Sequence, residues 1–250
     1  LVITDVTAAR EVEKLKLHFL SMVTHELKTP LTSVLGYTKV MSMGKGGELN
    51  EKQRGYIGII DAQASRLLSM IQDLLDMTRL EVGNLTIEVD PLRVLDLATS
   101  IYTSHLAAAK INDINFGLVP GEIQDEEILG DPLRLAQVLG NLIGNAFKFT
   151  PRGGEVILSL RRQGNQILLE LRDTGRGIPQ AAIPRLFEKF YQVERGDTRK
   201  AGGAGLGLYI CRELLAQMAG RIEVTSKAGQ GSRFTVFLPL YEPETSEQGI

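Results

Sequence analysis

A histidine at position 25 lies in a segment that could carry out nucleophilic chemistry. Residues 25–30 read His-Glu-Leu-Lys-Thr-Pro. On a helix Thr29 shares a face with His25, because it lies four residues further on, and Glu26 lies about 100° around the axis. A neutral imidazole nitrogen is a good nucleophile, and a neighbouring carboxylate can orient the ring or accept its other proton. This local pattern alone nevertheless favours the alternative, a surface histidine beside an unrelated glutamate.

A second candidate group lies in residues 141–148. Asn141, Asn145 and Lys148 are spaced i, i+4 and i+7, which places them in one polar stripe of a helix. Amide oxygens can ligate Mg²⁺, which also takes substrate phosphate oxygens, and a lysine adds a positive charge for phosphate. The alternative is an amphipathic helix with a hydrated face, although two asparagines in a helix interior are mildly unfavourable.

Two glycine-containing segments could lie close to a ligand. Residues 173–179 read Asp-Thr-Gly-Arg-Gly-Ile-Pro and follow an expected strand. Gly175 and Gly177 would let the backbone pass a flat ligand, and Asp173 can accept a hydrogen bond from an exocyclic amine. An ordinary turn explains these glycines equally well. Residues 202–208, Gly-Gly-Ala-Gly-Leu-Gly-Leu, open an expected helix, whose free N–H groups and dipole favour an anion. They match neither a P-loop nor a dinucleotide fingerprint.

The first third of the chain is expected to be helical. Val12, Leu15, Phe19 and Met22 step by 3, 4 and 3 residues, as in a coiled coil. Pro30, which has no N–H, predicts a kink in this helix. Glycines at 44, 46 and 47 then break the pattern before a second helix at about 51–81. One face of that helix carries Tyr56, Ile60, Gln63, Leu67, Met70, Leu74 and Met77.

Two long helices joined by a short loop predict an antiparallel hairpin. Because a lone hairpin buries little apolar surface, a dimeric four-helix bundle is the expected completion. A monomeric hairpin packed on the second domain is the alternative.

Strand and helix patterns are interspersed after Gly83. We expect strands at 85–90, 114–119, 155–161, 166–172, 221–226 and 232–240, and helices at 92–110, about 131–149 and 204–219. The elements do not strictly alternate, which favours an α/β sandwich with a mixed sheet covered by helices on one face. The fold class is therefore multidomain α+β. The expected domains are a signalling helix or linker (1–18), a helical hairpin (19–83), the sandwich (84–240) and a tail (241–250).

Composition restricts the classes of function. The 28 basic and 30 acidic residues give a net charge of −2, which argues against nucleic-acid binding and a polybasic membrane patch. The single cysteine excludes an intrachain disulfide, and with three histidines it argues against a zinc cluster. No apolar run approaches ~18 residues and no signal peptide is evident. We therefore expect a cytoplasmic segment, and since it starts without Met, any membrane anchor would lie upstream.

Five segments together resemble the sensor histidine kinases of two-component systems. Residues 25–30, 141–149 (Asn-Leu-Ile-Gly-Asn-Ala-Phe-Lys-Phe), 173–179, 187–191 (Phe-Glu-Lys-Phe-Tyr) and 202–208 resemble the family's H, N, G1, F and G2 boxes, in that order. The resemblance covers roughly residues 10–240. It implies a dimerisation and histidine phosphotransfer hairpin followed by an ATP-binding domain of the kind found in DNA gyrase. More weakly, residues 3–7 resemble the last strand of a PAS sensor domain.

The resemblance implies roles for the residues of the first two boxes. His25 would be the phosphoacceptor, and Glu26 the general base or the group that orients it. Thr29 would hold the water that dephosphorylates a response regulator. Asn145 would be the Mg²⁺ ligand, with Asn141 and Lys148 near the phosphates.

The remaining boxes would bind the nucleotide. Asp173 would read the adenine amine, and residues 192–202 would form a mobile lid. Further nucleotide contacts are implied for Gly175, Gly177, Ile178, Tyr191, Gly203, Gly205, Leu206 and Gly207. The chain departs from the family pattern at two places: Gln192 stands where some members carry an arginine, and Ala204 replaces the usual Thr or Ser.

The implied activity is ATP- and Mg²⁺-dependent autophosphorylation of His25, transfer to an aspartate of a response regulator receiver domain, and dephosphorylation of that regulator. The implied partners are a second copy of the chain, the regulator and an upstream sensor domain, without nucleic acid or membrane contact. A non-catalytic signalling scaffold and a gyrase-type ATPase are the alternatives. The input signal, the identity of the regulator and phosphorylation within or between subunits stay open.

Overall fold

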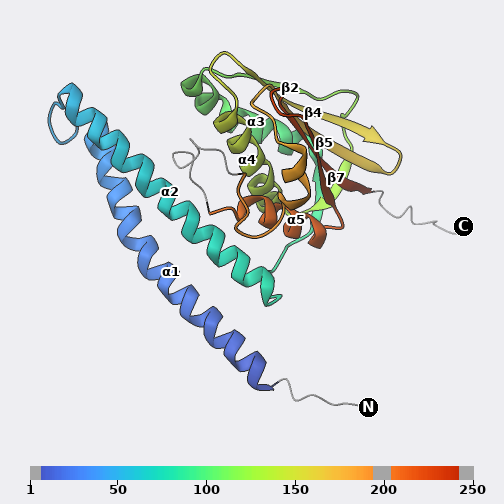
Figure 1. The fold of residues 1–250 in the computed structure, drawn as a ribbon, viewed down its shortest axis with the longest axis horizontal. Coiled ribbons are helices and arrows are strands. Elements are labelled where there is room, and N and C mark those ends of the chain that lie inside the picture. Colours follow the sequence, from blue (N-terminus) through green and yellow to red (C-terminus); the bar gives the residue numbers. More distant parts are fainter. Residues whose placement is uncertain (1–6, 194–203, 242–250) are drawn as a thin grey trace, which may run out of the picture. The chain divides into compact units, whose positions relative to one another are not determined.

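The computed structural model describes residues 7–193 and 204–241, with side chains described from Met22 onwards. The chain forms two compact units, Leu1–Leu85 and Thr86–Ile250, here called the hairpin unit and the sheet unit (Figure 1). The segment that weakly resembles a PAS strand, 3–7, falls almost entirely outside the described residues.

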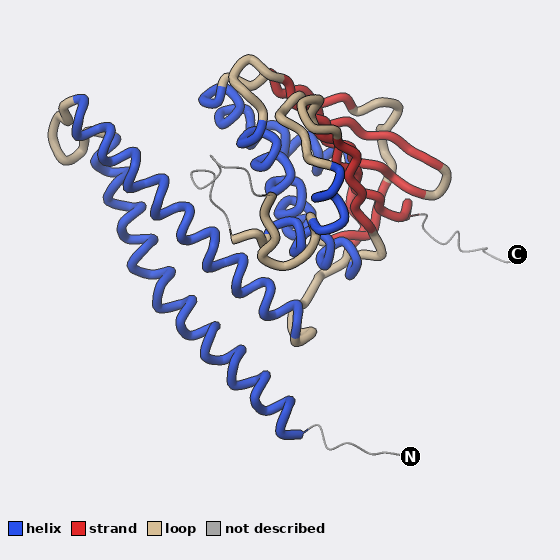
Figure 2. Tube along the Cα trace, viewed as in Figure 1, coloured by secondary structure: helices blue, strands red, loops and turns tan. Residues whose placement is uncertain are grey.

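The hairpin unit consists of two long helices, α1 (Thr7–Ser42) and α2 (Glu51–Glu81), as predicted (Figure 2). Pro30 does not interrupt α1, which is helical on both sides of it. In the connecting loop Gly44 and Gly47 have φ angles of 74° and 107°, which side chains with a Cβ rarely adopt. Asn50 then caps α2: its side chain accepts from the Gln53 N–H, and the Gln53 side chain accepts from the Asn50 N–H, both at 2.9 Å.

Apolar residues of α2 fall into two stripes. Ile57, Ala64 and Ile71 repeat every seven residues and are buried. In the stripe predicted from the sequence, burial changes along the helix: Met77 is buried, whereas Tyr56, Ile60 and Leu67 are 64%, 48% and 47% exposed. The hairpin therefore keeps an apolar surface that α1 does not cover. A hydrogen bond of 2.6 Å from the Thr38 hydroxyl to Asp61 Oδ1 joins the two helices.

The sheet unit is built on one mixed sheet. Its strands are β1 (Asp90–Arg93), β2 (Asn115–Val119), β3 (Glu127–Gly130), β4 (Glu155–Gln163), β5 (Gln166–Asp173), β6 (Arg221–Ser226) and β7 (Ser232–Tyr241). Their order is β1-β3-β7-β5-β4-β2, and β6 also pairs with β7. The pair β2–β4 is parallel, and the other pairs are antiparallel.

Three helices, α3 (Val94–Asn112), α4 (Pro132–Phe149) and α5 (Gly207–Gln217), cover one face of this sheet (Figure 1). The predicted mixed sheet with helices on one face is thus confirmed. A 3₁₀-helix, η1 (Gln180–Arg185), follows β5.

The core lies between α4 and the central strands. One face of α4 is buried, and buried residues alternate with partly exposed ones along β4. The buried residues of the two elements include Leu135, Leu139, Leu142, Ile143, Val156, Leu158 and Leu160. Asp131 caps α4 as predicted: its Oδ1 accepts from Leu133 N–H at 2.9 Å and Arg134 N–H at 3.1 Å. Such a cap contributes ~1 kcal/mol.

Some predicted element boundaries are wrong. The strand expected at 85–90 is wrong, because residues 85–89 are not in a strand and β1 begins only at Asp90; β3 was not expected at all. Both have four residues and pair with each other, so tertiary pairing rather than a periodic pattern specifies them. The helix expected from 204 begins at Gly207, and the one expected from 92 begins at Val94.

We predict that Asp73 makes the stability of the hairpin unit depend on pH. Burial, with the neighbouring Asp76 carboxylate, raises the pKa of Asp73 to about 6. A raised folded-state pKa favours the protonated form, so this group's contribution is greatest below about pH 4 and is lost as the pH rises toward 6.

Asp73→Asn should therefore raise the free energy of unfolding by about 1–2 kcal/mol more at pH 7.5 than at pH 4. This figure is reduced to allow for the partial exposure of Asp73. Denaturant unfolding across this pH range measures the difference. Glu48→Gln, in the exposed loop, serves as the control. An Asp73→Asn effect that is equal at both pH values would contradict the prediction.

Candidate functional site

His25 projects from α1 into solvent, with its side chain 78% exposed. Its Nδ1 lies 3.5 Å from Glu26 Oε1, so the structure brings together the predicted histidine and carboxylate. With a proton on Nδ1 facing the carboxylate, the unprotonated nitrogen is Nε2. The geometry therefore suits nucleophilic attack by Nε2, with Glu26 orienting the ring and stabilising positive charge on it.

Thr29 lies one turn further along α1, and its hydroxyl donates to the backbone carbonyl of His25 at 3.3 Å. Thr32 and Ser33 make the same kind of bond to the carbonyls four residues before them, at 2.8 and 3.2 Å. The Thr29 hydroxyl is exposed and keeps lone pairs that can accept from water. The structure thus places Thr29 beside His25, as expected from the spacing.

Asp173 ends β5 as a buried carboxylate, 7% exposed. Its Oδ1 accepts a 2.7 Å bond from the Gly175 N–H, and the N–H and hydroxyl of Ser232 also donate to it. Burial raises the pKa of Asp173, and these hydrogen bonds offset the rise only in part. Ser232 had no signal in the sequence, because it lies opposite Asp173 only through the β5–β7 register.

The two glycines after Asp173 are required by close backbone packing. A Cβ on Gly175 would lie 2.6 Å from the carbonyl oxygen of Phe149, and one on Gly177 (φ 63°) only 2.0 Å from that of Lys227. The next residue, Ile178, donates its N–H to Ser226 Oγ at 2.8 Å. The loop therefore threads between the end of α4 and the β6–β7 turn.

The polar stripe of α4 contacts the first turn of α5. Asn145 Nδ2 donates to Asn141 Oδ1 at 3.2 Å, and Asn141 Nδ2 donates to Cys211 Sγ at 3.4 Å. A Cβ on Gly207 would lie 2.3 Å from Asn141 Nδ2, so the amide occupies the space that a side chain would need. Cys211 was missed, although it lies four residues after Gly207 and hence on the same face of α5.

Lys148 and Arg176 lie near one aromatic ring. Lys148 Nζ is 4.9 Å, and Arg176 Cζ 4.3 Å, from the centre of the Phe149 ring. The Arg176 N–H also donates to the Phe149 carbonyl at 3.2 Å. These contacts hold the predicted lysine beside the loop that follows Asp173.

The F and G2 boxes meet at a backbone contact. The Phe190 N–H donates to the carbonyl of Gly205 at 3.0 Å, and Gly205, with φ 72°, has no room for a Cβ against Phe190. Leu206 is buried, and the Tyr191 ring lies 4.4 Å from Arg185 Cζ. Gly203 and residues 194–202 of the expected lid lie outside the described residues, while Gln192 is exposed.

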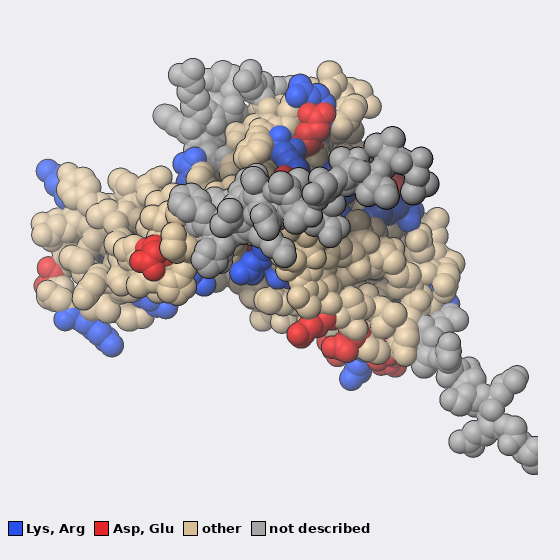
Figure 3. All heavy atoms as spheres, turned by 90° about the horizontal axis from the view of Figure 1, so that it is seen from below, with Lys and Arg blue, Asp and Glu red and all other residues tan. Residues whose placement is uncertain are grey.

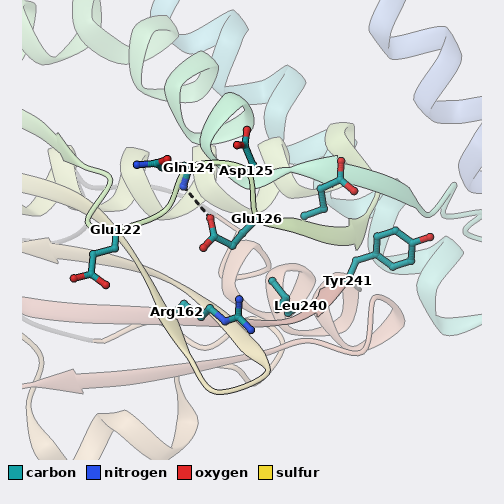
Figure 4. Close-up of a pocket in the computed structure, with 8 residues that line it drawn as sticks. Glu122, Gln124, Asp125, Glu126, Arg162, Leu240 and Tyr241 are labelled. Atoms are coloured by element: carbon teal, nitrogen blue, oxygen red, sulfur yellow. Dashed lines mark hydrogen bonds between the residues drawn. The ribbon is translucent and has the colours of Figure 1, made fainter. Parts of the chain in front are cut away.

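A pocket of about 560 Å³ lies elsewhere in the sheet unit (Figure 4). Its lining includes four carboxylates, Glu122, Asp125, Glu126 and Glu127, against one guanidinium, Arg162. The Gln124 N–H donates to Glu126 Oε2 at 2.8 Å, and this bond lowers the pKa of Glu126. The negative charge disfavours a polyphosphate, so this pocket is not the expected nucleotide site.

Charged residues are mixed on the face shown in Figure 3, where basic and acidic side chains of the described residues are interspersed. Of the described helices, none combines the length and apolar character that crossing a membrane requires. Among described His, Cys, Asp and Glu residues there is also no group of three that could hold a metal ion. A metal site formed by an amide oxygen and phosphate oxygens would need no such group of three residues.

Two family descriptions match the two units. Residues 15–83 match the His Kinase A (phospho-acceptor) domain, and residues 130–242 match the histidine kinase-, DNA gyrase B- and HSP90-like ATPase. The chain is 38% identical over 229 residues to the circadian input-output histidine kinase CikA of Synechococcus elongatus, covering 90% of this chain and 30% of that protein. It is 37% identical to the signal transduction histidine-protein kinase BarA of Escherichia coli K12, covering 93% and 25%.

The chain belongs to the sensor histidine kinases of two-component systems. It thus carries the phospho-acceptor and ATPase domains of a protein histidine kinase, and it spans 30% and 25% of the lengths of the two relatives named above.

Solved structures of histidine kinases share the fold. Full-length ShkA in complex with AMPPNP is 30% identical with a TM-score of 0.68, covering 89% of this chain and 46% of that one. The Acinetobacter baumannii histidine kinase AdeS, at 20% identity, matches with a TM-score of 0.59 over 87% of this chain and 98% of that one, which shows the fold alone.

We predict that ATP binding by this histidine kinase weakens on acidification at a pH above the ordinary carboxyl range near 4. If Asp173 reads the adenine amine, its ionised form would accept that hydrogen bond better than its protonated form, and burial raises the pKa of this carboxyl. Affinity should be full above the raised pKa and should fall as the pH drops through it.

Calorimetric titration with a non-hydrolysable ATP analogue at a series of pH values measures this. Asp173→Asn should bind weakly and lose the pH dependence, and Glu223→Gln, on an exposed part of β6, should behave as wild type. A wild-type affinity that changes only near pH 4 would contradict the prediction.

Proposed function

We propose that this chain is the catalytic core of a kinase that transfers the γ-phosphoryl group of ATP to His25 and then to an aspartate of a response regulator. The observation that carries the proposal is the pairing of an exposed His25 with Glu26 on one unit, together with the matched ATPase domain on the other. The intact Asp173, Asn145 and glycine segments of that domain argue against a degenerate scaffold.

The adenine end of ATP would be held by Asp173, whose carboxylate is pre-organised by Gly175 and Ser232. A purine amine donates a hydrogen bond that this carboxylate can accept. Gly175, Gly177 and Ile178 would form the wall beside the base, because their backbone is fixed against Phe149, Lys227 and Ser226.

The phosphate end would lie toward Asn145, Lys148 and the residues around Gly205 and Gly207 at the start of α5. The bare N–H groups of a helix N-terminus favour an anion. Asn145 suits Mg²⁺, because its Nδ2 is engaged by Asn141 and its carbonyl oxygen is the ligand type that this ion prefers. When bound, Mg²⁺ would neutralise charge on the phosphate oxygens.

Phosphoryl transfer would begin with attack of His25 Nε2 on the γ-phosphorus. The N–P bond forms as the bond to the β–γ bridging oxygen breaks, and ADP leaves with that electron pair. The Nδ1 proton stays on the ring beside Glu26, whose carboxylate stabilises the positive charge that develops there. Catalysis is then mainly positioning and charge stabilisation, as in other phosphoryl transfers.

The exposed apolar surface of the hairpin unit supports a homodimer. Tyr56, Ile60 and Leu67 of α2, with Val34 and Tyr37 of α1, are each 40% exposed or more. A second hairpin would bury such residues in a four-helix bundle.

We predict that His25→Ala abolishes incorporation of label from γ-labelled ATP, because the attacking nitrogen is lost. In the wild type the phosphate should be acid-labile and base-stable, as expected for a phosphoramidate. Ser33→Ala, on the same exposed stretch of α1, should label normally. Label that persists in His25→Ala would overturn the proposed acceptor, and release of free phosphate without any protein adduct would indicate an ATPase instead.

We predict that Thr29 and Glu26 separate two activities. The Thr29 hydroxyl can hold water but is too weak a base to assist His25. Thr29→Ala should therefore keep autophosphorylation within a few-fold while slowing dephosphorylation of the regulator. Glu26→Gln should slow autophosphorylation by ~10²-fold, because the negative charge that stabilises the ring as it becomes positive is lost.

The measurements are label uptake by the kinase and decay of the phosphorylated regulator with each variant. Thr32→Ala is a matched control, because the Thr32 hydroxyl makes the same kind of bond to the carbonyl four residues before it and lies three positions beyond Thr29 on α1. If Thr29→Ala accelerates regulator decay as well as wild type does, Thr29 does not position the water.

A further inference from the structure

Cys211 lies one turn into α5, buried to 1% exposure, with its thiol between two groups of α4. The sulfur accepts from Asn141 Nδ2 at 3.4 Å, and the thiol donates to the backbone carbonyl of Val138 at 3.8 Å. A carbonyl oxygen accepts only, so the thiol hydrogen points to Val138 and the sulfur lone pairs remain for Asn141.

This arrangement decides which way the Asn141 amide faces. A side-chain amide has a donor end and an acceptor end, and its neighbours determine the orientation. Because Cys211 takes the Nδ2 end, Oδ1 faces Asn145, where it accepts from Asn145 Nδ2 at 3.2 Å. Gly207 confines the same amide, because its Cα leaves room for Asn141 and for no Cβ.

The orientation of the Asn141 amide also determines the orientation of the Asn145 amide. With its Nδ2 directed to Asn141, the Asn145 side chain keeps its Oδ1 on the other side, and no described residue donates a hydrogen bond to that oxygen. A flipped Asn141 would present an NH₂ group to the Asn145 NH₂, which is repulsive and would favour rotation of the Asn145 amide as well. The nitrogen would then replace the oxygen that a hard cation requires.

We propose that Cys211 is a positioning residue that acts through Asn141 to hold the Asn145 carbonyl oxygen ready for Mg²⁺. The proposal deepens the proposed function and rests on its assignment of Asn145 as the metal ligand. In this proposal Asn141 acts by orienting the Asn145 amide, and this role does not require Asn141 to contact phosphate.

The test is the Mg²⁺ affinity of the intact chain with a non-hydrolysable ATP analogue. Mg²⁺ is titrated calorimetrically into the protein–analogue complex, and analogue binding is also measured without Mg²⁺. Cys211→Ala removes the acceptor and should weaken Mg²⁺ binding roughly 3- to 10-fold, the effect of losing one modest hydrogen bond. Metal-free binding of the analogue should change less than two-fold.

Cys211→Ser is the matched rescue variant, because a hydroxyl can donate to Val138 and accept from Asn141 as the thiol does. Its Mg²⁺ affinity should lie within about two-fold of wild type. The side-chain NH₂ resonances of Asn141 and Asn145 supply a second readout: both should shift in Cys211→Ala and return toward wild type in Cys211→Ser. If Cys211→Ala does not fold, Cys211→Val replaces it, keeping the volume without the acceptor.

The outcomes separate this inference from the proposed function. Asn145→Ala should lose the Mg²⁺ dependence, and if it does not, the assignment of the metal ligand fails. If Asn145→Ala loses it but Cys211→Ala binds Mg²⁺ as wild type does, the positioning role of Cys211 is overturned. If Ser and Ala at position 211 weaken Mg²⁺ binding equally, the effect is one of packing, and the relay is likewise overturned.

Discussion

Burial of one face of α4 against the sheet is the constraint on which the rest of the sheet unit depends. Leu135, Leu139 and Leu142 face the core, so the helix can present Asn141 and Asn145 only on its other side. That side meets the first turn of α5 at Gly207, and the end of α4 meets the loop after Asp173 at Phe149. One amphipathic helix thereby sets the positions of both ends of the proposed nucleotide site.

The glycines of this kinase serve the protein's own packing first. Gly175, Gly177, Gly205 and Gly207 each bring a backbone or amide group closer than a Cβ would allow. The loops are therefore held before any ligand binds, which lowers the entropy lost on binding. Close packing by protein groups and close approach of a ligand are compatible roles, because both need a bare backbone.

The two units present their chemistry in opposite ways. His25 and Glu26 are exposed on their helix, as suits a proposed acceptor that would meet both a nucleotide and a regulator. Asp173 and Asn141, by contrast, are fixed by several partners within the sheet unit. An exposed acceptor and a pre-organised binding site fit the proposed reaction, in which positioning supplies most of the catalysis.

The sequence by itself determined the long helices, the mixed sheet and the adjacency of His25 and Glu26, since all of these follow from periodicity or from neighbouring positions. It also predicted the stripe of Asn141 and Asn145, because i, i+4 spacing places both on one face of a helix. Only the tertiary structure decided that Ser232 donates to Asp173, that Cys211 orients Asn141, and that β1 pairs with β3. These contacts join residues 40 or more positions apart or strands too short to show a pattern, so nothing local in the chain encodes them.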